Sequence, residues 1–313
     1  MPYAFDPELL PLVDMLPQSD FADIEASRAN TEKLLAPMNA QVDATGVAIE
    51  DREIPGPEGA PDLLVRIYAP EGDAPAGGRP AMLDIHGGGF CSGSIAMEHG
   101  FGVAVARRLG ATVVAVEYRL APEHPFPAGI EDCYAALCWM HREADALQLD
   151  PNRIAVGGQS AGGGLTAGTV LLARDRGGPP VCFQFLGIPE LDHRLETTSM
   201  RTFVDTPLWH RPNAEISWRN YLGEDCTEVS PYASPSIATD LRGLPPAYVT
   251  TMEFDPLRDE GIIYALRMME AGVSVELHSY PGTFHGSAVM QNAAVSRRAG
   301  EELMVALRRG LGL

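Results

Sequence analysis

A serine between glycines is the residue in this sequence best placed to act as a nucleophile. Residues 158–162 read Gly-Gln-Ser-Ala-Gly, after a strand-like run at 153–157 and before a helix-prone run. In this context the chain makes a sharp turn that exposes the serine hydroxyl, and the glycines allow strand and helix to approach closely. An ordinary glycine-rich helix start is the alternative. We predict that Ser160 is a catalytic nucleophile, with the helix dipole favouring negative charge beside it.

A glycine triplet supplies the second chemical feature. Residues 86–90 read His-Gly-Gly-Gly-Phe and follow the apolar run at 81–85. Glycines at such a position allow backbone N–H groups to face a substrate oxygen. Together with the N–H of Ala161, these donors would form an oxyanion hole. We expect His86 to orient this loop rather than to act as a base.

A serine nucleophile needs a base and a carboxylate that orients the base. Four histidines follow Ser160 in the sequence, and only His285 lies in a loop after the final predicted strand. Asp255 follows the preceding strand, from which a carboxylate can reach that loop. Asp192, one strand earlier, is the alternative acid. The other histidines are His193 and His210, in a region without strands, and His278, inside a strand.

The elements that must position these residues alternate along the chain. Helix-prone runs at 98–109, 128–146, 161–174, 258–271 and 289–309 separate most of the strand-like runs. This alternation is typical of an α/β protein with a mainly parallel sheet, and the two closely spaced first strands predict an antiparallel hairpin. The expected strands are 47–54, 63–68, 81–85, 112–117, 154–157, 181–188, 247–252 and 273–280.

Two segments lie outside this alternation. We assign residues 1–46 to N-terminal cap helices, with one helix from Asp20 to Ala36 that Asp20 caps and Pro37 ends. Residues 191–244 are a cap insertion between two parts of the core, 47–190 and 245–313. A long insertion of this kind commonly forms a lid or binding element. The aromatic side chains that we expect to line a substrate pocket are Phe5, Phe21, Phe203, Trp209 and Trp218.

Composition restricts the partners and the compartment. Asp and Glu number 42 against 23 Lys and Arg, which gives a formal net charge of −19. A surface this acidic repels nucleic acid and anionic lipid. We also find no signal peptide, no membrane-spanning run and no zinc-binding spacing, and the five cysteines form no C-x-x-C pair. We therefore expect a cytoplasmic protein without a metal, a cofactor or a membrane or nucleic-acid partner.

As a set, the motifs resemble those of the hormone-sensitive lipase family of α/β-hydrolases, the bacterial family IV esterases. The resemblance covers most of the chain after about residue 60. It includes the motifs at 158–163 and 86–90, the latter followed by Gly93 and Ser94. It also includes Tyr-Arg-Leu-Ala-Pro-Glu at 118–123, Val-Ser-Pro at 229–231, Asp-Pro-Leu-Arg-Asp at 255–259 and His-Gly at 285–286.

The resemblance implies a fold and an activity. It implies an α/β-hydrolase fold with a mostly parallel eight-stranded sheet, flanking helices and a helical cap. It further implies a homodimer and a carboxylesterase acting on small esters of short- to medium-chain acids. The implied site has Ser160, Asp255 and His285 as the triad and Gly88, Gly89 and Ala161 as oxyanion donors.

Two residues depart from the family pattern. Gln159 stands where an aspartate is common, which removes a charge beside the serine. Ser287 replaces a common aromatic residue, and we expect it to widen or wet the pocket beside the base. A lactonase or amidase on the same fold is one alternative function. A non-catalytic receptor for a small ligand, like the plant gibberellin receptors, is another, although those receptors have lost the catalytic histidine.

Overall fold

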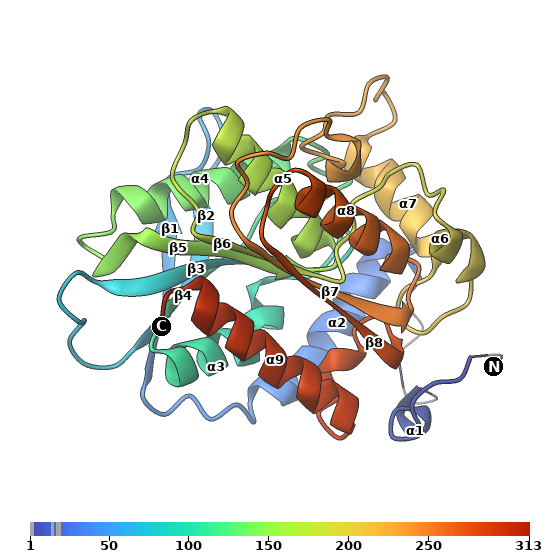
Figure 1. Cartoon of the computed structure of the whole chain (residues 1–313), viewed down its shortest axis with the longest axis horizontal. Coiled ribbons are helices and arrows are strands. Elements are labelled where there is room, and N and C mark those ends of the chain that lie inside the picture. Colours follow the sequence, from blue (N-terminus) through green and yellow to red (C-terminus); the bar gives the residue numbers. More distant parts are fainter. Residues whose placement is uncertain (1–2, 14–15, 17–19) are drawn as a thin grey trace.

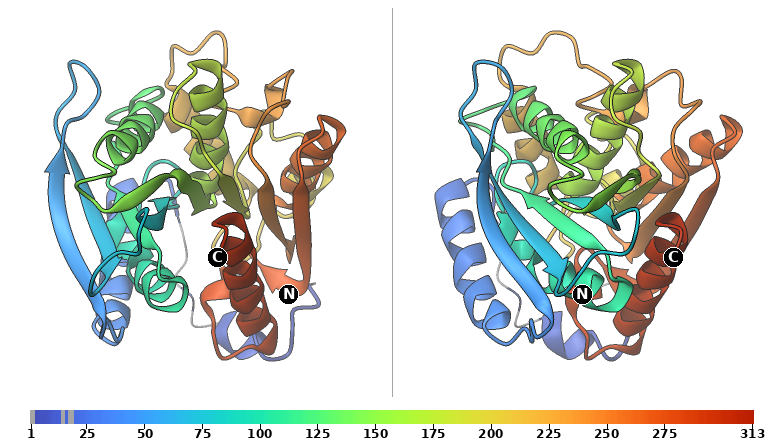
Figure 2. Two further views of the ribbon diagram at one scale, coloured as in Figure 1. Left: turned by 60° about the vertical axis from the view of Figure 1, so that its left-hand side comes forward. Right: turned by 90° about the vertical axis from the view of Figure 1, so that its left-hand side faces the viewer.

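An eight-stranded sheet runs through this computed structural model, which describes residues 3–13, 16 and 20–313. The strand order is β1-β2-β4-β3-β5-β6-β7-β8. Strands β1 and β2 form the predicted antiparallel hairpin at one edge, and β8 lies at the opposite edge (Figure 2). The strands are β1 (Val47–Ile54), β2 (Leu63–Pro70), β3 (Arg79–Ile85), β4 (Thr112–Val116), β5 (Leu149–Gln159), β6 (Phe183–Gly187), β7 (Ala247–Phe254) and β8 (Val275–Phe284).

Helices cover both faces of the sheet (Figure 1). On one face lie α3 (His99–Leu109) and α9 (Ala294–Gly310), and on the other lie α4 (Ala128–Arg142), α5 (Ala161–Asp175) and α8 (Arg258–Glu270). Because helices cover both sides, every residue of β3, β4 and β6 is buried. The strands run parallel from β4 through β3 to β8, so the predicted fold class is confirmed.

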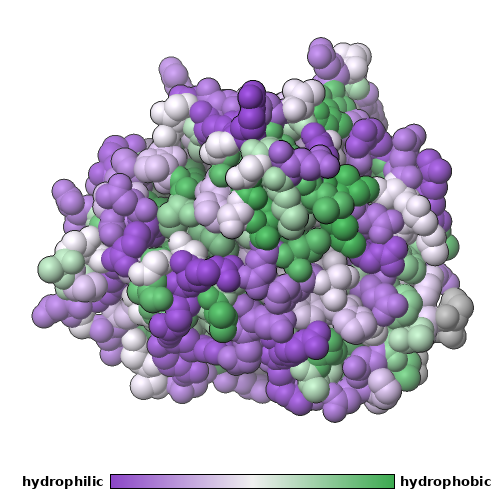
Figure 3. Space-filling view, in the orientation of Figure 1, coloured by the Kyte–Doolittle hydropathy of each residue, from purple (hydrophilic) through white to green (hydrophobic). Residues whose placement is uncertain are grey.

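The outer face of α8 carries exposed apolar side chains. Ile263, Leu266 and Met269 are each more than 40% exposed, and Figure 3 shows hydrophobic side chains gathered over this helix. The spacing of three residues places the side chains on one face of the helix. This face lies beside β8, the edge strand of the sheet (Figure 1).

The N-terminal segment and the insertion contribute helices outside the sheet. They include α1 (Leu10–Val13) and α2 (Ile24–Asn39) from the first segment, and α6 (Thr198–Thr202) and α7 (Arg211–Leu222) from the second. The two segments touch: the N–H of Phe21 donates to Asn213 Oδ1 at 3.3 Å. They therefore lie side by side beyond the carboxyl ends of the strands. The described 3₁₀ turns are η1 (Ile95–Glu98), η2 (Pro235–Ile237) and η3 (Ser287–Val289).

The predicted bounds of three helices were wrong, and the first of these, α4, ends at Arg142 rather than at 146. Helix α2 begins after Asp23, whose Oδ1 accepts from the N–H of Ala26 at 2.9 Å, whereas Asp20 closes a turn just upstream. Pro37 lies inside the last turn of α2 rather than ending it, because a proline there removes only one backbone hydrogen bond. Helix α9 begins at Ala294 instead of 289, since residues 287–289 form the separate turn η3.

The junction between β5 and α5 is too tight for side chains at its glycines. Ser160 has φ 58° and ψ −124°, a conformation that costs free energy in a residue other than glycine. A Cβ on Gly158 would lie 2.3 Å from the carbonyl oxygen of Ile85, and a Cβ on Gly162 would lie 2.0 Å from the same atom. The end of β3 and the serine turn are therefore in direct backbone contact, as the flanking glycines predicted.

This backbone contact leads to a prediction about the free energy of unfolding. Gly162→Ala should lower the free energy of unfolding by about 1–3 kcal/mol, because the added methyl group collides with backbone that cannot move aside cheaply. Gly300→Ala is the matched control, since Gly300 also lies within a helix but a Cβ there meets no atom closer than 4.0 Å. The control should gain up to about 1 kcal/mol from helix propensity. Urea denaturation of both variants tests this, and equal stabilities would contradict it.

Candidate active site

Three residues from separate loops form one chain of hydrogen bonds. Ser160 immediately precedes α5, Asp255 follows β7 and His285 follows β8. His285 Nε2 lies 3.0 Å from Ser160 Oγ, and His285 Nδ1 lies 2.8 Å from Asp255 Oδ2. A carboxylate can only accept, so it holds the ring hydrogen on Nδ1 and leaves Nε2 able to accept the serine proton. The structure thus brings together the serine, acid and histidine that the sequence predicted.

The two candidate acids have different partners. Asp255 is fully buried, and its Oδ1 accepts from the N–H of Leu257 at 2.9 Å, which fixes the carboxylate opposite His285. Asp192 instead pairs with Arg194, with two oxygen–nitrogen distances of 2.7 Å. The geometry therefore favours Asp255. The remaining candidate histidines lie elsewhere: His278 contacts Glu276 and Glu302, His193 contacts Ser234, and His210 precedes α7.

The glycine triplet lies beside the serine. A Cβ on Gly87 would lie 3.4 Å from Ser160 Cβ. Gly88 and Gly89 have φ of +116° and +55°, backbone conformations that favour glycine. Among the described residues, no acceptor is bonded to the amides of Gly88, Gly89 or Ala161. Three free N–H donors near a serine hydroxyl can stabilise an oxyanion.

His86 supports the loop, in line with its predicted role. Its ring is fully buried and stacks on Tyr118, with ring centroids 4.2 Å apart. Nδ1 lies 2.8 Å from the carbonyl oxygen of Gly87, and the Tyr118 hydroxyl donates to the carbonyl of His86 at 3.0 Å. Burial lowers the pKa of His86 to about 4, so the ring is neutral at pH 7.

Arg28 of α2 fixes the same loop from the other side, a role that sequence reasoning missed. Its Nε donates to the carbonyl of Cys91 at 2.8 Å, and Nη2 donates to the carbonyl of Ala121 at 3.1 Å. Both terminal nitrogens also bond Glu123, each at 2.8 Å. The motif at 118–123 therefore ties the cap to the loop. A lone arginine on a polar helix carries no sequence signal for such a contact.

Two of the five predicted pocket aromatics lie against the catalytic residues. A Cβ on Gly89 would lie 2.6 Å from the Trp209 ring and 2.7 Å from the Phe21 ring. The Trp209 ring centroid is also 5.8 Å from that of His285. For the other three, the structure records contacts with other aromatic residues: Trp218 contacts Phe90, whereas Phe5 and Phe203 pack on Phe254.

The structure shows where Ser287 and Gln159, the two residues that depart from the family pattern, lie. Ser287 is fully buried, and its Oγ accepts from the N–H of Phe284 at 3.3 Å. The Ser287 hydroxyl thus closes the histidine loop, and the expectation that Ser287 widens or wets the pocket stays a prediction. Gln159 is half-buried, and its side chain packs over Gly187 at the end of β6.

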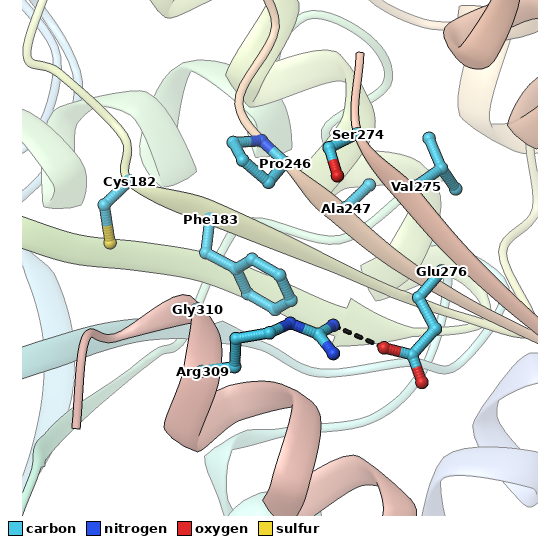
Figure 4. Close-up of a pocket in the computed structure, with 9 residues that line it drawn as sticks. All are labelled: Cys182, Phe183, Pro246, Ala247, Ser274, Val275, Glu276, Arg309 and Gly310. Atoms are coloured by element: carbon cyan, nitrogen blue, oxygen red, sulfur yellow. Dashed lines mark hydrogen bonds and ion pairs between the residues drawn. The ribbon is translucent and has the colours of Figure 1, made fainter.

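A separate surface pocket of about 430 Å³ lies at the opposite ends of the strands (Figure 4). Its lining includes Cys182, Ala247 and Val275, which stand at the amino ends of β6, β7 and β8. Arg309 in this pocket is paired with Glu276. The pocket is thus remote from Ser160, which lies at the carboxyl end of β5. Within the described ranges, no three His, Cys, Asp or Glu side chains are grouped so that they could hold a metal ion.

Comparison with known proteins identifies the family. Residues 82–289 match a sequence family described as having the α/β hydrolase fold. The carboxylesterase NlhH of Mycobacterium tuberculosis is 38% identical over 98% of this chain and 96% of its own length. The chain belongs to this family of hormone-sensitive lipase-like hydrolases. It is a carboxylic ester hydrolase.

Other relatives are also esterases. A solved structure titled bacterial heroin esterase is 57% identical, covers 98% of each chain and superposes with a TM-score of 0.96. The ethyl acetate hydrolase of Pseudomonas putida is 32% identical over 78% of this chain and 76% of its own length. In the part of the chain that the structure describes, no helix has both the length and the apolar character needed to cross a bilayer.

The hydrogen-bond geometry predicts that substitutions of the two candidate acids, Asp255 and Asp192, have different effects on kcat. Asp255→Asn should lower kcat on the order of 10⁴-fold, because an asparagine can donate to Nδ1 and so stabilise the wrong histidine tautomer. Asp192→Asn is the matched control and should cost far less, since Asp192 contacts Arg194 rather than His285. Steady-state kinetics on one soluble ester tests both variants. A larger loss in Asp192→Asn would move the acid to that residue.

Proposed function

We propose that the protein is a serine carboxylesterase for small esters of short- to medium-chain acids. The observation that carries the proposal is the chain of hydrogen bonds from Asp255 through His285 to Ser160. In the proposed first step, Ser160 Oγ bonds to the ester carbonyl carbon and its proton passes to His285 Nε2. Asp255 stabilises the imidazolium that results.

The remaining steps again pass protons through His285. The bond from the carbonyl carbon to the alcohol oxygen breaks, and the alcohol leaves with the proton of His285, so an acyl-serine remains. Water then attacks this acyl-enzyme, gives a proton to His285 and releases the acid as Ser160 regains its hydrogen. The amides of Gly88, Gly89 and Ala161 are the proposed donors to the negatively charged oxygen in both halves of the reaction.

The nucleophile can be tested by labelling. Ser160→Ala should abolish ester turnover while the protein stays folded, because removal of one hydroxyl leaves the backbone contacts of the turn intact. An organophosphate should add to the wild type once, on Ser160, as measured by intact mass and peptide mapping. An adduct on another residue, or substantial activity in Ser160→Ala, would refute the assignment.

The proposed preference for short acyl chains rests on the walls beside the triad. Trp209 and Phe21 are about 4% exposed and lie against Gly89, so cap and core close together beside the reacting groups. Each methylene buried against such walls gains roughly 0.8 kcal/mol until the pocket is full. The names of the ethyl acetate hydrolase and the heroin esterase agree with small acyl groups, since heroin carries acetate esters.

We expect kcat/KM to rise from acetate, to peak at about butyrate to hexanoate and to fall for longer chains, with up to about a fourfold gain per methylene before the peak. Trp209→Ala should move the peak to longer acyl chains because it removes a wall. Phe203→Ala is the control, since this aromatic packs on Phe254 instead. A series of soluble esters, with lactones and amides included, measures this. Equal rates on acetate and palmitate esters would contradict a closed pocket.

The homodimer expected from the family resemblance stays a prediction. The exposed apolar face of α8 beside the edge strand β8 is our candidate for the contact, because two copies could bury that face and pair their edge strands. The receptor alternative is weaker, since His285 is present and bonded to both Asp255 and Ser160.

A further inference from the structure

Glu190 is a buried acid next to the nucleophile that the proposed mechanism does not use. It follows β6, and its N–H donates to the backbone carbonyl of Ser160 at 3.0 Å. Its side chain is fully buried, and within the described residues Oε2 has no hydrogen-bond partner. The other oxygen, Oε1, lies 3.3 Å from Ser217 Oγ. A charged carboxylate with so few partners would be costly to bury.

Ser217 connects this acid to the oxyanion loop. It lies on α7, is fully buried, and its Oγ is 2.9 Å from the carbonyl oxygen of Gly89. A carbonyl only accepts, and a hydroxyl has one hydrogen to give. When Ser217 donates to Gly89, its contact with Glu190 can be a hydrogen bond only if Glu190 carries the proton. The geometry thus couples the protonation of Glu190 to the bond at Gly89.

The surroundings of Glu190 favour its neutral form. Burial is the main cause that raises its pKa to about 8, and the charge of Asp255 adds to it, while the bond from Ser217 opposes them. Burial also raises the pKa of three other groups that interact with Glu190. These groups, from other elements, are Cys91 after β3, Tyr221 of α7 and Glu260 of α8.

We infer that Glu190 is a positioning residue for the oxyanion hole: as a neutral acid it donates to Ser217, which directs the Ser217 hydrogen to the Gly89 carbonyl. That bond fixes the peptide plane after Gly89. The fixed plane limits rotation at Gly89, and so holds the conformation in which the Gly89 amide, in the preceding peptide plane, faces the substrate. The inference rests on the proposed role of Ser160 and adds residues that do not touch the substrate.

Ionisation of Glu190 should break this link. Above about pH 8 the carboxylate can only accept, so it takes the Ser217 hydrogen and the Gly89 carbonyl loses its donor. The developing oxyanion is then stabilised less well, whereas ground-state binding is little affected. We expect kcat to fall on the alkaline side with an apparent pKa of about 8, with KM nearly unchanged.

The first experiment compares pH profiles of kcat for a soluble acetate ester, corrected for uncatalysed hydrolysis. Glu190→Gln keeps a neutral donor to Ser217, so it should retain activity at pH 7 and lose the alkaline fall. Glu98→Gln is the matched control, because Glu98 is another buried acid whose pKa burial raises, and it lies beside Asp84 rather than the triad. An unchanged alkaline fall in Glu190→Gln, or its disappearance in Glu98→Gln, would overturn the inference.

A second variant keeps the test valid if Glu190→Gln does not fold. Ser217→Ala should lower kcat at pH 7 on the order of fivefold, which corresponds to one net hydrogen bond. The ratio of wild-type to variant kcat should approach one well above pH 8, where the wild type has already lost the link. A ratio that does not change with pH would overturn the inference. Organophosphate labelling of wild-type Ser160 separates this failure from failure of the proposed function, since it depends only on the nucleophile.

Discussion

The backbone contact between the end of β3 and the serine turn is the constraint on which the site depends. No Cβ fits at Gly158 or Gly162, because the carbonyl oxygen of Ile85 already occupies the space. This contact places the loop at 86–90 beside Ser160, so the nucleophile and the free amides come from adjacent parallel strands. The loops after β7 and β8 then add Asp255 and His285 at the same edge of the sheet. Loops at the carboxyl edge of a parallel sheet can therefore converge on one substrate.

The parts of the structure that depend on local pattern could be predicted from the sequence. Apolar runs of strand length located all eight strands, and β1 has the predicted bounds. The glycine motifs located Ser160 and the loop at 86–90 because they require close backbone approach. Chain order then pointed to Asp255 and His285. Helix α2 was misplaced at both ends, since two aspartates could cap it and a proline in a last turn does not end a helix.

The contacts between distant segments could not be predicted. Arg28 lies 95 positions from Glu123, and Ser217 lies 128 positions from Gly89. Each residue type is common, and each segment by itself is an ordinary polar helix. The contrast between Asp255 and Glu190 also depends on the folded state. Asp255 accepts from Leu257 and His285, whereas the Glu190 carboxyl has one side-chain contact, to Ser217 at 3.3 Å.

Helix α2 has no buried residue, and Leu34 and Met38 on it are nearly half exposed. The described polar contacts that hold it to the loop region are those of Arg28 and the bond from Asn39 to the carbonyl of Ala96. The free energy of a local opening depends largely on the apolar contacts that it breaks. Detachment of this helix would therefore break few such contacts. The attachment of this part of the cap therefore depends on a few polar bonds, whereas the sheet is held by a large apolar core.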